Sequence, residues 1–214
     1  MFEIEETGGA YIGSGQATWP FAKLLVNKNE LQLNASIIGN LYFRPSDIIS
    51  IELFSAIFRS GIKINHRVNG YSEKVVFLTS GSRDLIKRIT DTEFLNNNSV
   101  LPAAVEAKIV KYQSIGSFPL KWSAVIVFVV IWNFLLLGDL LGFFGNNDNH
   151  TVMSLGGQLA PAFAFLFALA IIISALFSRL VLKKGHKAKD IKSFLFFLMA
   201  ITGFIFIMVS LISH

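Results

Sequence analysis

The chain contains no cysteine, which excludes disulfides, thiolate metal ligands and a cysteine nucleophile. Its four histidines, His66, His150, His186 and His214, are scattered and form no cluster with the spacing of metal ligands. The catalytic signatures GxSxG and HExxH and the Walker-type phosphate loop are also missing. The sequence therefore predicts no catalytic residue, no metal site and no cofactor, and we expect a protein that is not an enzyme.

Charged residues are scarce and unevenly distributed. They make up 15% of the chain, against 53% hydrophobic residues, a balance more apolar than that of ordinary soluble domains. Residues 1–110 hold 11 Lys and Arg against 11 Asp and Glu, whereas residues 111–214 hold 8 against 3. The net charge of +5 thus belongs to the second half, and the neutral first half offers no basic stripe for nucleic acid. We predict an integral membrane protein that does not bind nucleic acid.

Three long apolar stretches dominate the second half, and we predict that residues 121–214 form a membrane domain with spans at about 122–144, 159–182 and 194–212. A basic hinge separates the last two spans, and it consists of Arg179, Lys183, Lys184, Lys187, Lys189 and Lys192. Because Lys and Arg mark the cytoplasmic side of short membrane loops, this hinge places the N-terminus in the cytoplasm and the C-terminus outside. The first residues also lack the basic and apolar regions of a secretory signal. We expect a bacterial inner membrane.

One carboxylate and one amide side chain fall inside the first predicted span. Asp139 lies near its outer end, where a carboxylate either reaches headgroups and water or serves as a proton or partner contact. Asn133 lies deeper, and we expect its amide to bond a neighbouring helix, with Ser174 and Thr202 as candidate partners.

Small residues recur at four-residue spacing in the first two spans. Gly138 and Gly142 form a GxxxG pair, and Ala160, Ala164 and Ala168 form a stripe. Such positions let helix backbones approach closely. They predict either packing within a three-span bundle or contact between copies in a homo-oligomer.

The sequence pattern of residues 1–110 predicts a small β-rich domain. Residues 1–16 show no apolar period and are predicted to be a flexible lead-in. From residue 17 to 67 short runs alternate with period two, and Asn69-Gly70 predicts a tight type I′ hairpin to a return strand. Ser82 is expected to cap a helix that carries Leu85 and Ile89 on its apolar face. The domain is expected to span 17–94, with residues 95–120 as a linker or juxtamembrane segment.

This order of small strands followed by one amphipathic helix resembles the pleckstrin-homology-like (PH-like) superfold, in particular its GRAM-like and bacterial membrane-anchored members. The passages that carry the resemblance are ATWPFAKLLV (17–26), ELQL (30–33), LYFRPSDIISIEL (41–53), GIKINH (61–66) and VVFL (75–78). The resemblance implies an α+β chain, in which a small antiparallel β-barrel with a C-terminal capping helix precedes the three-span domain. Lipid-binding members carry several basic residues in the loop after the first strand. Here that loop offers Lys28 beside Lys23, which argues against phosphoinositide binding.

The combination favours a cytoplasmic interaction domain held at the membrane surface, with membrane lipids and a cytoplasmic protein as partners. It would act as an adaptor, a scaffold or a regulatory subunit. The alternative is an oligomeric transporter or channel component in which Asn133 and Asp139 line a polar path. Trp19 and Phe21, in the first predicted strand, are expected in the core, with an exposed contact patch as the alternative.

Overall fold

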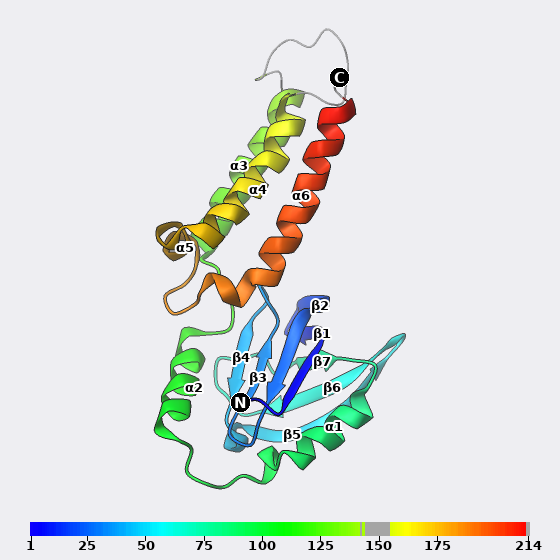
Figure 1. Cartoon of the computed structure of the whole chain (residues 1–214), viewed down its shortest axis with the longest axis vertical. Coiled ribbons are helices and arrows are strands. Elements are labelled where there is room, and N and C mark those ends of the chain that lie inside the picture. The colour runs from blue at the N-terminus through cyan, green and yellow to red at the C-terminus, as the bar shows by residue number, and fades with distance from the viewer. Residues whose placement is uncertain (142, 144–154, 213–214) are drawn as a thin grey trace. The chain divides into compact units, whose positions relative to one another are not determined.

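The computed structural model describes residues 1–141, 143 and 155–212, which form two compact units, Met1–Pro119 and Leu120–His214. The first is a sheet unit and the second a helical unit, so the α+β class is confirmed (Figure 1). The sheet unit contains β1 (Ile4–Ile12), β2 (Gly15–Val26), β3 (Leu31–Asn34), β4 (Asn40–Phe43), β5 (Ile48–Ala56), β6 (Arg59–His66), β7 (Val75–Leu78), α1 (Ser82–Asp91) and α2 (Ala103–Ile115). Short 3-10 turns lie at Pro45–Asp47 and Phe94–Asn96.

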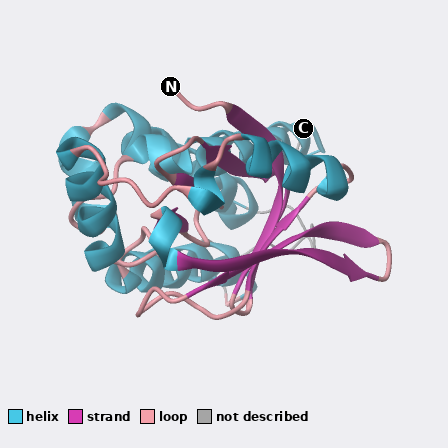
Figure 2. Ribbon diagram, turned by 90° about the horizontal axis from the view of Figure 1, so that it is seen from below, coloured by secondary structure: helices cyan, strands magenta, loops and turns pink. Residues whose placement is uncertain are grey.

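The seven strands form one antiparallel sheet in the order β4-β3-β2-β1-β7-β6-β5. The sheet is strongly twisted and curls into a half-barrel, as Figure 2 shows in magenta. β1 is central, pairing with β2 on one side and β7 on the other. The prediction of a flexible lead-in at residues 1–16 is therefore wrong for β1, which joins the two halves of the sheet.

Glycine explains why β1 shows no apolar alternation in the sequence and how closely neighbouring strands approach one another. A Cβ at Gly8 would lie 2.3 Å from the Leu78 carbonyl oxygen, and one at Gly61 would lie 2.1 Å from that of Phe77. Only glycine allows the backbones to approach this closely. The same glycine that permits the close approach removes the apolar side chain by which a strand is recognised in a sequence.

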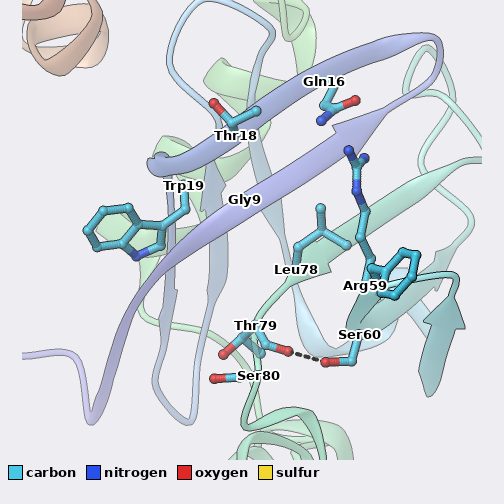
Figure 3. A pocket seen from close by; sticks show the side chains of 10 residues that line it. Gly9, Gln16, Thr18, Trp19, Arg59, Ser60, Leu78, Thr79 and Ser80 are labelled. Carbon is cyan, nitrogen blue, oxygen red and sulfur yellow. Dashed lines mark hydrogen bonds between the residues drawn. The ribbon is translucent and has the colours of Figure 1, made fainter.

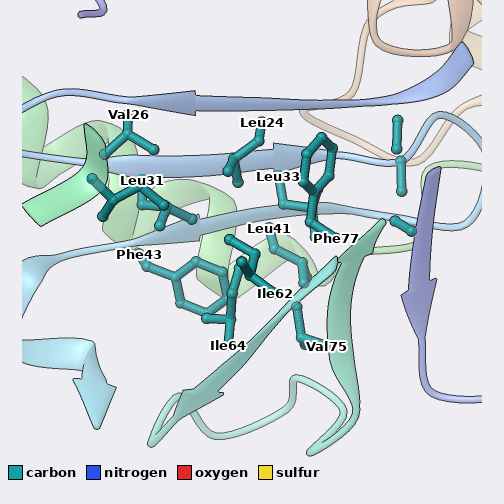
Figure 4. Packing of buried hydrophobic residues seen from close by; sticks show 14 of the residues in the cluster. Leu24, Val26, Leu31, Leu33, Leu41, Phe43, Ile62, Ile64, Val75 and Phe77 are labelled. Carbon is teal, nitrogen blue, oxygen red and sulfur yellow. The ribbon is translucent and has the colours of Figure 1, made fainter. Parts of the chain in front are cut away.

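The core lies on the concave side of the sheet. Its fully buried side chains include Leu24, Leu33, Phe43, Ile62 and Phe77 (Figure 4). At about 1.5–3 kcal/mol for each large apolar side chain removed from water, this cluster provides the main driving force for folding of the unit.

Helix α1 packs against β5 and β6, as the apolar face of the sequence predicts. Leu85 and Ile89, one helical turn apart, are buried in the core, and Ile86 packs against its margin. The helix begins at Ser82, but its N-cap position is occupied by Gly81. Arg88, beside this apolar face, forms an ion pair with Glu6 of β1.

The turns differ from those expected. Gly70 has the positive φ (+85°) that the Asn69-Gly70 dipeptide predicts. However, β6 ends at His66 and β7 begins at Val75, so the connection is a loop and not a tight hairpin. The tight two-residue turn is Ile57-Phe58, between β5 and β6, where the residues flanking it, Ala56 and Arg59, form the last pair.

The helical unit contains α3 (Trp122–Leu140), α4 (Leu155–Ile173), α5 (Ala175–Val181), a 3-10 turn (Ala188–Ile191) and α6 (Lys192–Ile212). α4 packs against both α3 and α6. The predicted span 159–182 is interrupted: Ser174 is extended (φ −106°, ψ 110°), and its Oγ accepts a hydrogen bond from the Phe177 N–H to cap α5. Ser174 therefore separates α4 from α5 by capping the second helix. The apolar character of the sequence continues across this position, so hydropathy alone predicts one uninterrupted span.

Two helical stretches in the described part of the chain are long and apolar enough to cross a membrane, Gly156–Ile173 and Ala188–Leu211. The stretch Trp122–Gly138 is also apolar but shorter. Three spans and their orientation stay predictions, and the predicted outer loop at residues 145–149 lies outside the described residues.

Candidate functional site

An irregular stretch of β2 creates an open hollow on the convex side of the sheet. Gly8 pairs with Ala22 and Ala10 with Ala17, so four residues of β2, 18–21, stand opposite the single residue Gly9. A bulge of this kind bends a strand and redirects its side chains. Here it lifts Thr18 and Trp19 beside a hollow of about 330 Å³.

The floor of the hollow is Leu78, which lies between two glycines. It pairs with Gly9 on β1 and with Gly61 on β6, so no side chain flanks it on either neighbouring strand. Trp19 and Phe58 also line the hollow, and the other lining residues include the polar Gln16, Thr18 and Thr79. Figure 3 shows Trp19 and Leu78 among these residues. The Ser60 hydroxyl donates a 2.9 Å hydrogen bond to the Thr79 carbonyl and fixes the lower margin.

Cations gather beside the hollow. The Arg59 guanidinium donates a hydrogen bond to the Tyr11 hydroxyl and lies 5.6 Å from the centre of that ring. The Lys74 ammonium lies 4.8 Å from the same centre. Phe54 meets the Tyr11 ring edge to face at 6.3 Å. Two positively charged side chains, Arg59 and Lys74, therefore contact the Tyr11 ring close to the exposed aromatic residues of the hollow.

The structure separates the two aromatic residues that were expected together in the core. Phe21 is partly buried and packs against the core, whereas Trp19 is 72% exposed, so the core prediction is wrong for Trp19. Trp19 belongs to the bulge, where the alternation of inward and outward positions no longer holds. Phe58 and Arg59 were not predicted from the sequence. The one available signal was the apolar pair Ile57-Phe58 between two strands, where a turn normally carries polar residues.

The chain was compared with family models, curated proteins and solved structures. None of them matches.

Of the two edges of the sheet, β4 is covered. The Tyr42 N–H donates a 3.3 Å bond to the Tyr71 hydroxyl, and its carbonyl accepts a 2.9 Å bond from the Gln113 amide of α2. The same amide reaches Asp47 at 2.8 Å, and Tyr112 stacks on the Tyr42 ring at 4.1 Å. Burial raises the pKa of Tyr71 to about 12, against the smaller lowering effect of its backbone hydrogen bond.

Ion pairs hold α2 in this position. Arg44 follows β4 and binds Glu106 at 2.6 Å, and Lys108 binds the buried carboxylate of Glu30 at 3.0 Å. Residues 95–120, predicted as a linker or juxtamembrane segment, thus include a helix that packs on the sheet unit.

The other edge, β5, is open. It ends the strand order, and in the part of the chain that the structure describes β6 is its one strand partner. Ile49 and Leu53 on this strand are 62% and 53% exposed. A long edge strand with exposed apolar side chains is a surface ready to pair with another chain.

Among the described residues of the helical unit, the amide of Asn133 bonds its own helix and not a neighbouring one. Its Nδ2 donates a 2.7 Å bond to the Val129 carbonyl one turn back in α3, and Thr202 bonds the Leu198 carbonyl of α6 in the same way. Asp139 belongs to α3, but its side chain lies outside what the structure describes. Gly142 also lies outside the described residues, so the GxxxG pair has one described member, Gly138, which is buried.

The alanine stripe of α4 is buried inside the unit. Ala160, Ala164 and Ala168 have no exposed surface, and Phe165 of the same helix lies 3.6 Å from where a Cβ on Gly203 of α6 would stand. This favours packing within the unit over contact between copies.

The basic hinge surrounds the start of α6. Arg179 lies in the last turn of α5, and Lys192 is the first residue of α6. Lys121, before α3, donates a 2.7 Å bond to the Arg179 carbonyl, and Leu120 pairs with Leu182. The start of α3, the end of α5 and the start of α6 therefore share one end of the unit, and positive charge gathers there. The remaining hinge lysines, Lys183, Lys184, Lys187 and Lys189, lie between Val181 and Ile191.

Proposed function

We propose that this protein is a membrane-anchored interaction platform. Its sheet unit is a PH-like domain in the cytoplasm, and its helical unit crosses a bacterial inner membrane three times with the C-terminus outside. The platform acts as an adaptor, scaffold or regulatory subunit and not as an enzyme. Its partner is a cytoplasmic protein that adds an extended segment to β5.

The open β5 edge is the observation that supports this proposal most strongly. A partner strand there would gain backbone hydrogen bonds from a regular ladder, and specificity from alternate side chains such as Ile49 and Leu53. The other edge has its backbone groups taken by Tyr71 and Gln113. One sheet thus presents one covered edge and one edge suited to a partner.

The short connection between the units supports the anchoring role. The Ser117 carbonyl accepts a bond from Asn40 in the sheet unit, and Leu120 pairs with Leu182 in the helical unit. Only residues 118–119 lie between these two attachment points. A domain tethered by so short a connection to a membrane anchor meets partners near the bilayer at high effective concentration.

The transporter alternative gains no support from Asn133. One N–H of its Nδ2 is bonded to the Val129 carbonyl within α3, so in the described part of the chain the amide gives no sign of a polar path or of a second helix. We therefore propose the platform alone.

The test uses a photo-reactive residue at Ser55, which is exposed on β5, in the full-length chain in its native membrane. We expect one discrete cross-linked protein, identified by mass spectrometry. Adding Leu53→Lys, which blunts the edge with a charge, should abolish that product.

Val110→Lys is the matched control, because Val110 is 48% exposed and lies on α2, which packs against β4. It should leave the cross-linked product unchanged. If both lysine variants give the same products as the unmodified chain, the β5 edge is not the contact surface. If every product is a second copy of this chain, the adaptor function is refuted.

A further inference from the structure

The tip of the β5–β6 hairpin is made of residues that folding alone would not select. Ile57 and Phe58 are 84% and 101% exposed. Phe58 has a φ of +59°, a conformation that glycine and asparagine adopt readily and a large L residue does not. Phe58 is thus unfavourable both in its backbone conformation and in its exposure to solvent. We take this as a sign that its side chain serves a contact with another molecule.

Trp19 extends this apolar surface. It lines the same hollow as Phe58, but it comes from the bulge of β2, a separate element. Two exposed aromatic residues from different parts of the chain therefore line one hollow, together with the apolar side chain of Leu78. Apolar surface of this kind, rimmed by polar groups, marks an interaction site.

The charges next to this surface indicate what it contacts. Arg59 follows the tip directly, and Lys74 joins it above the Tyr11 ring. The carboxylate on this hairpin, Glu52, lies several residues from the tip and accepts hydrogen bonds from Ser50 and Asn65. Tryptophan and phenylalanine backed by cations are typical of groups that settle at the boundary of an anionic bilayer.

We propose that Trp19, Ile57 and Phe58 insert into the headgroup region of the bilayer, with Arg59 and Lys74 contacting anionic lipid phosphates. This inference rests on the proposed membrane anchoring, because the tether keeps the sheet unit close to the lipid. A bilayer, and not a folded partner, is the occupant because the tip is a protruding turn with cations behind it. It gives the sheet unit a second attachment to the membrane and so fixes which way β5 faces.

Because the chain has no native cysteine, a single site can be labelled without altering other residues. Full-length Ile57→Cys carries an environment-sensitive NBD fluorophore and is reconstituted into vesicles of phosphatidylethanolamine and phosphatidylglycerol. Val100→Cys, at a position 97% exposed in a loop, is the control of equal exposure. Ile207→Cys, on the exposed side of α6, reports on the anchor itself.

Spin-labelled lipids that quench the fluorophore supply the readout. We expect quenching at position 57 at least about twofold greater than at position 100, and weaker quenching when phosphatidylcholine replaces the anionic lipid. Arg59→Gln should remove most of that dependence on lipid charge.

The three positions separate the two proposals. Strong quenching at 207 with equal, weak quenching at 57 and 100 refutes bilayer contact by the tip and leaves the anchor intact. Weak quenching at 207 refutes the anchor. A label at 57 that is shielded from aqueous iodide yet not quenched by lipid is covered by a second copy of the chain, which also overturns the proposal.

Discussion

Replacing Phe58 with glycine should stabilise the sheet unit while removing a proposed contact group. A left-handed backbone costs an L residue roughly 1–2 kcal/mol, which glycine does not incur. Glycine loses roughly 0.5–1 kcal/mol more backbone entropy on folding. Because the ring is fully exposed, its removal forfeits no buried surface. The free energy of unfolding should therefore rise by about 0.5–1 kcal/mol in Phe58→Gly.

Hydrogen exchange of the β6 and β7 amides in the full-length protein in detergent measures this change in the sheet unit alone. Exchange limited by global unfolding of the unit should slow roughly two- to fivefold. Phe58→Ala is the matched control, since it removes the ring but keeps a Cβ at the same φ, and it should change stability by less than about 0.5 kcal/mol. A glycine variant no more stable than the alanine variant would refute the argument from backbone conformation. An alanine variant that loses more than about 1 kcal/mol would show that the ring is packed in the folded state.

Two further predictions concern the covered edge. The Tyr71 pKa of about 12 exceeds the value of about 10 expected in an unfolded chain. The neutral hydroxyl therefore stabilises the fold fully below pH 10, and this contribution, about 2–3 kcal/mol, is lost between pH 10 and 12. In a denaturant titration at pH 9 and pH 12, Tyr71→Phe should show a smaller fall in stability than the native chain; an equal fall would contradict a buried neutral tyrosine. Lys108→Met should cost about 1–3 kcal/mol, because it leaves the buried Glu30 carboxylate without its cation. Adding Glu30→Gln should recover part of that loss in the same exchange experiment, and no recovery would show that packing of the lysine stem was the cause.

The parts of the fold that could be predicted from the sequence are those with side-chain periodicity. Ile62 and Ile64 alternate on β6 and both point into the core, and Leu85 and Ile89 define the buried face of α1. Burial of one face imposes these periods, so the pattern and the structure share one cause.

Other parts follow from contacts that are distant in the sequence. Gly8 fits its central strand because the backbone of Leu78, seventy residues later in the chain, comes too close for any side chain there. The partners of α2 are equally remote: Glu30 and Arg44 precede Lys108 and Glu106 by more than sixty residues. The α2 side chains that make these contacts are polar and only half-buried, and Ile109 is the residue of α2 that is fully buried. The sequence of α2 therefore lacks the strong apolar face that would predict its packing on the sheet.

The candidate site was the least predictable part because each of its elements breaks a rule. Trp19 occupies a bulge in which alternation fails, and Phe58 occupies a turn without a turn residue. Sequence reasoning assumes that local preferences are followed, whereas interaction surfaces are among the places where they are overridden.

The central position of β1 has a consequence for how the chain is made. β1 leaves the ribosome before its partners, and β2 can pair with it at once through a two-residue turn. Its other neighbour, β7, is synthesised last among the strands, so the inner edge of β1 stays unpaired while β3 to β6 are being translated. The half-barrel can close only when residue 78 has emerged, and until then the nascent chain presents a strand edge that chaperones, or the β1–β2 hairpins of neighbouring nascent chains, are able to pair with.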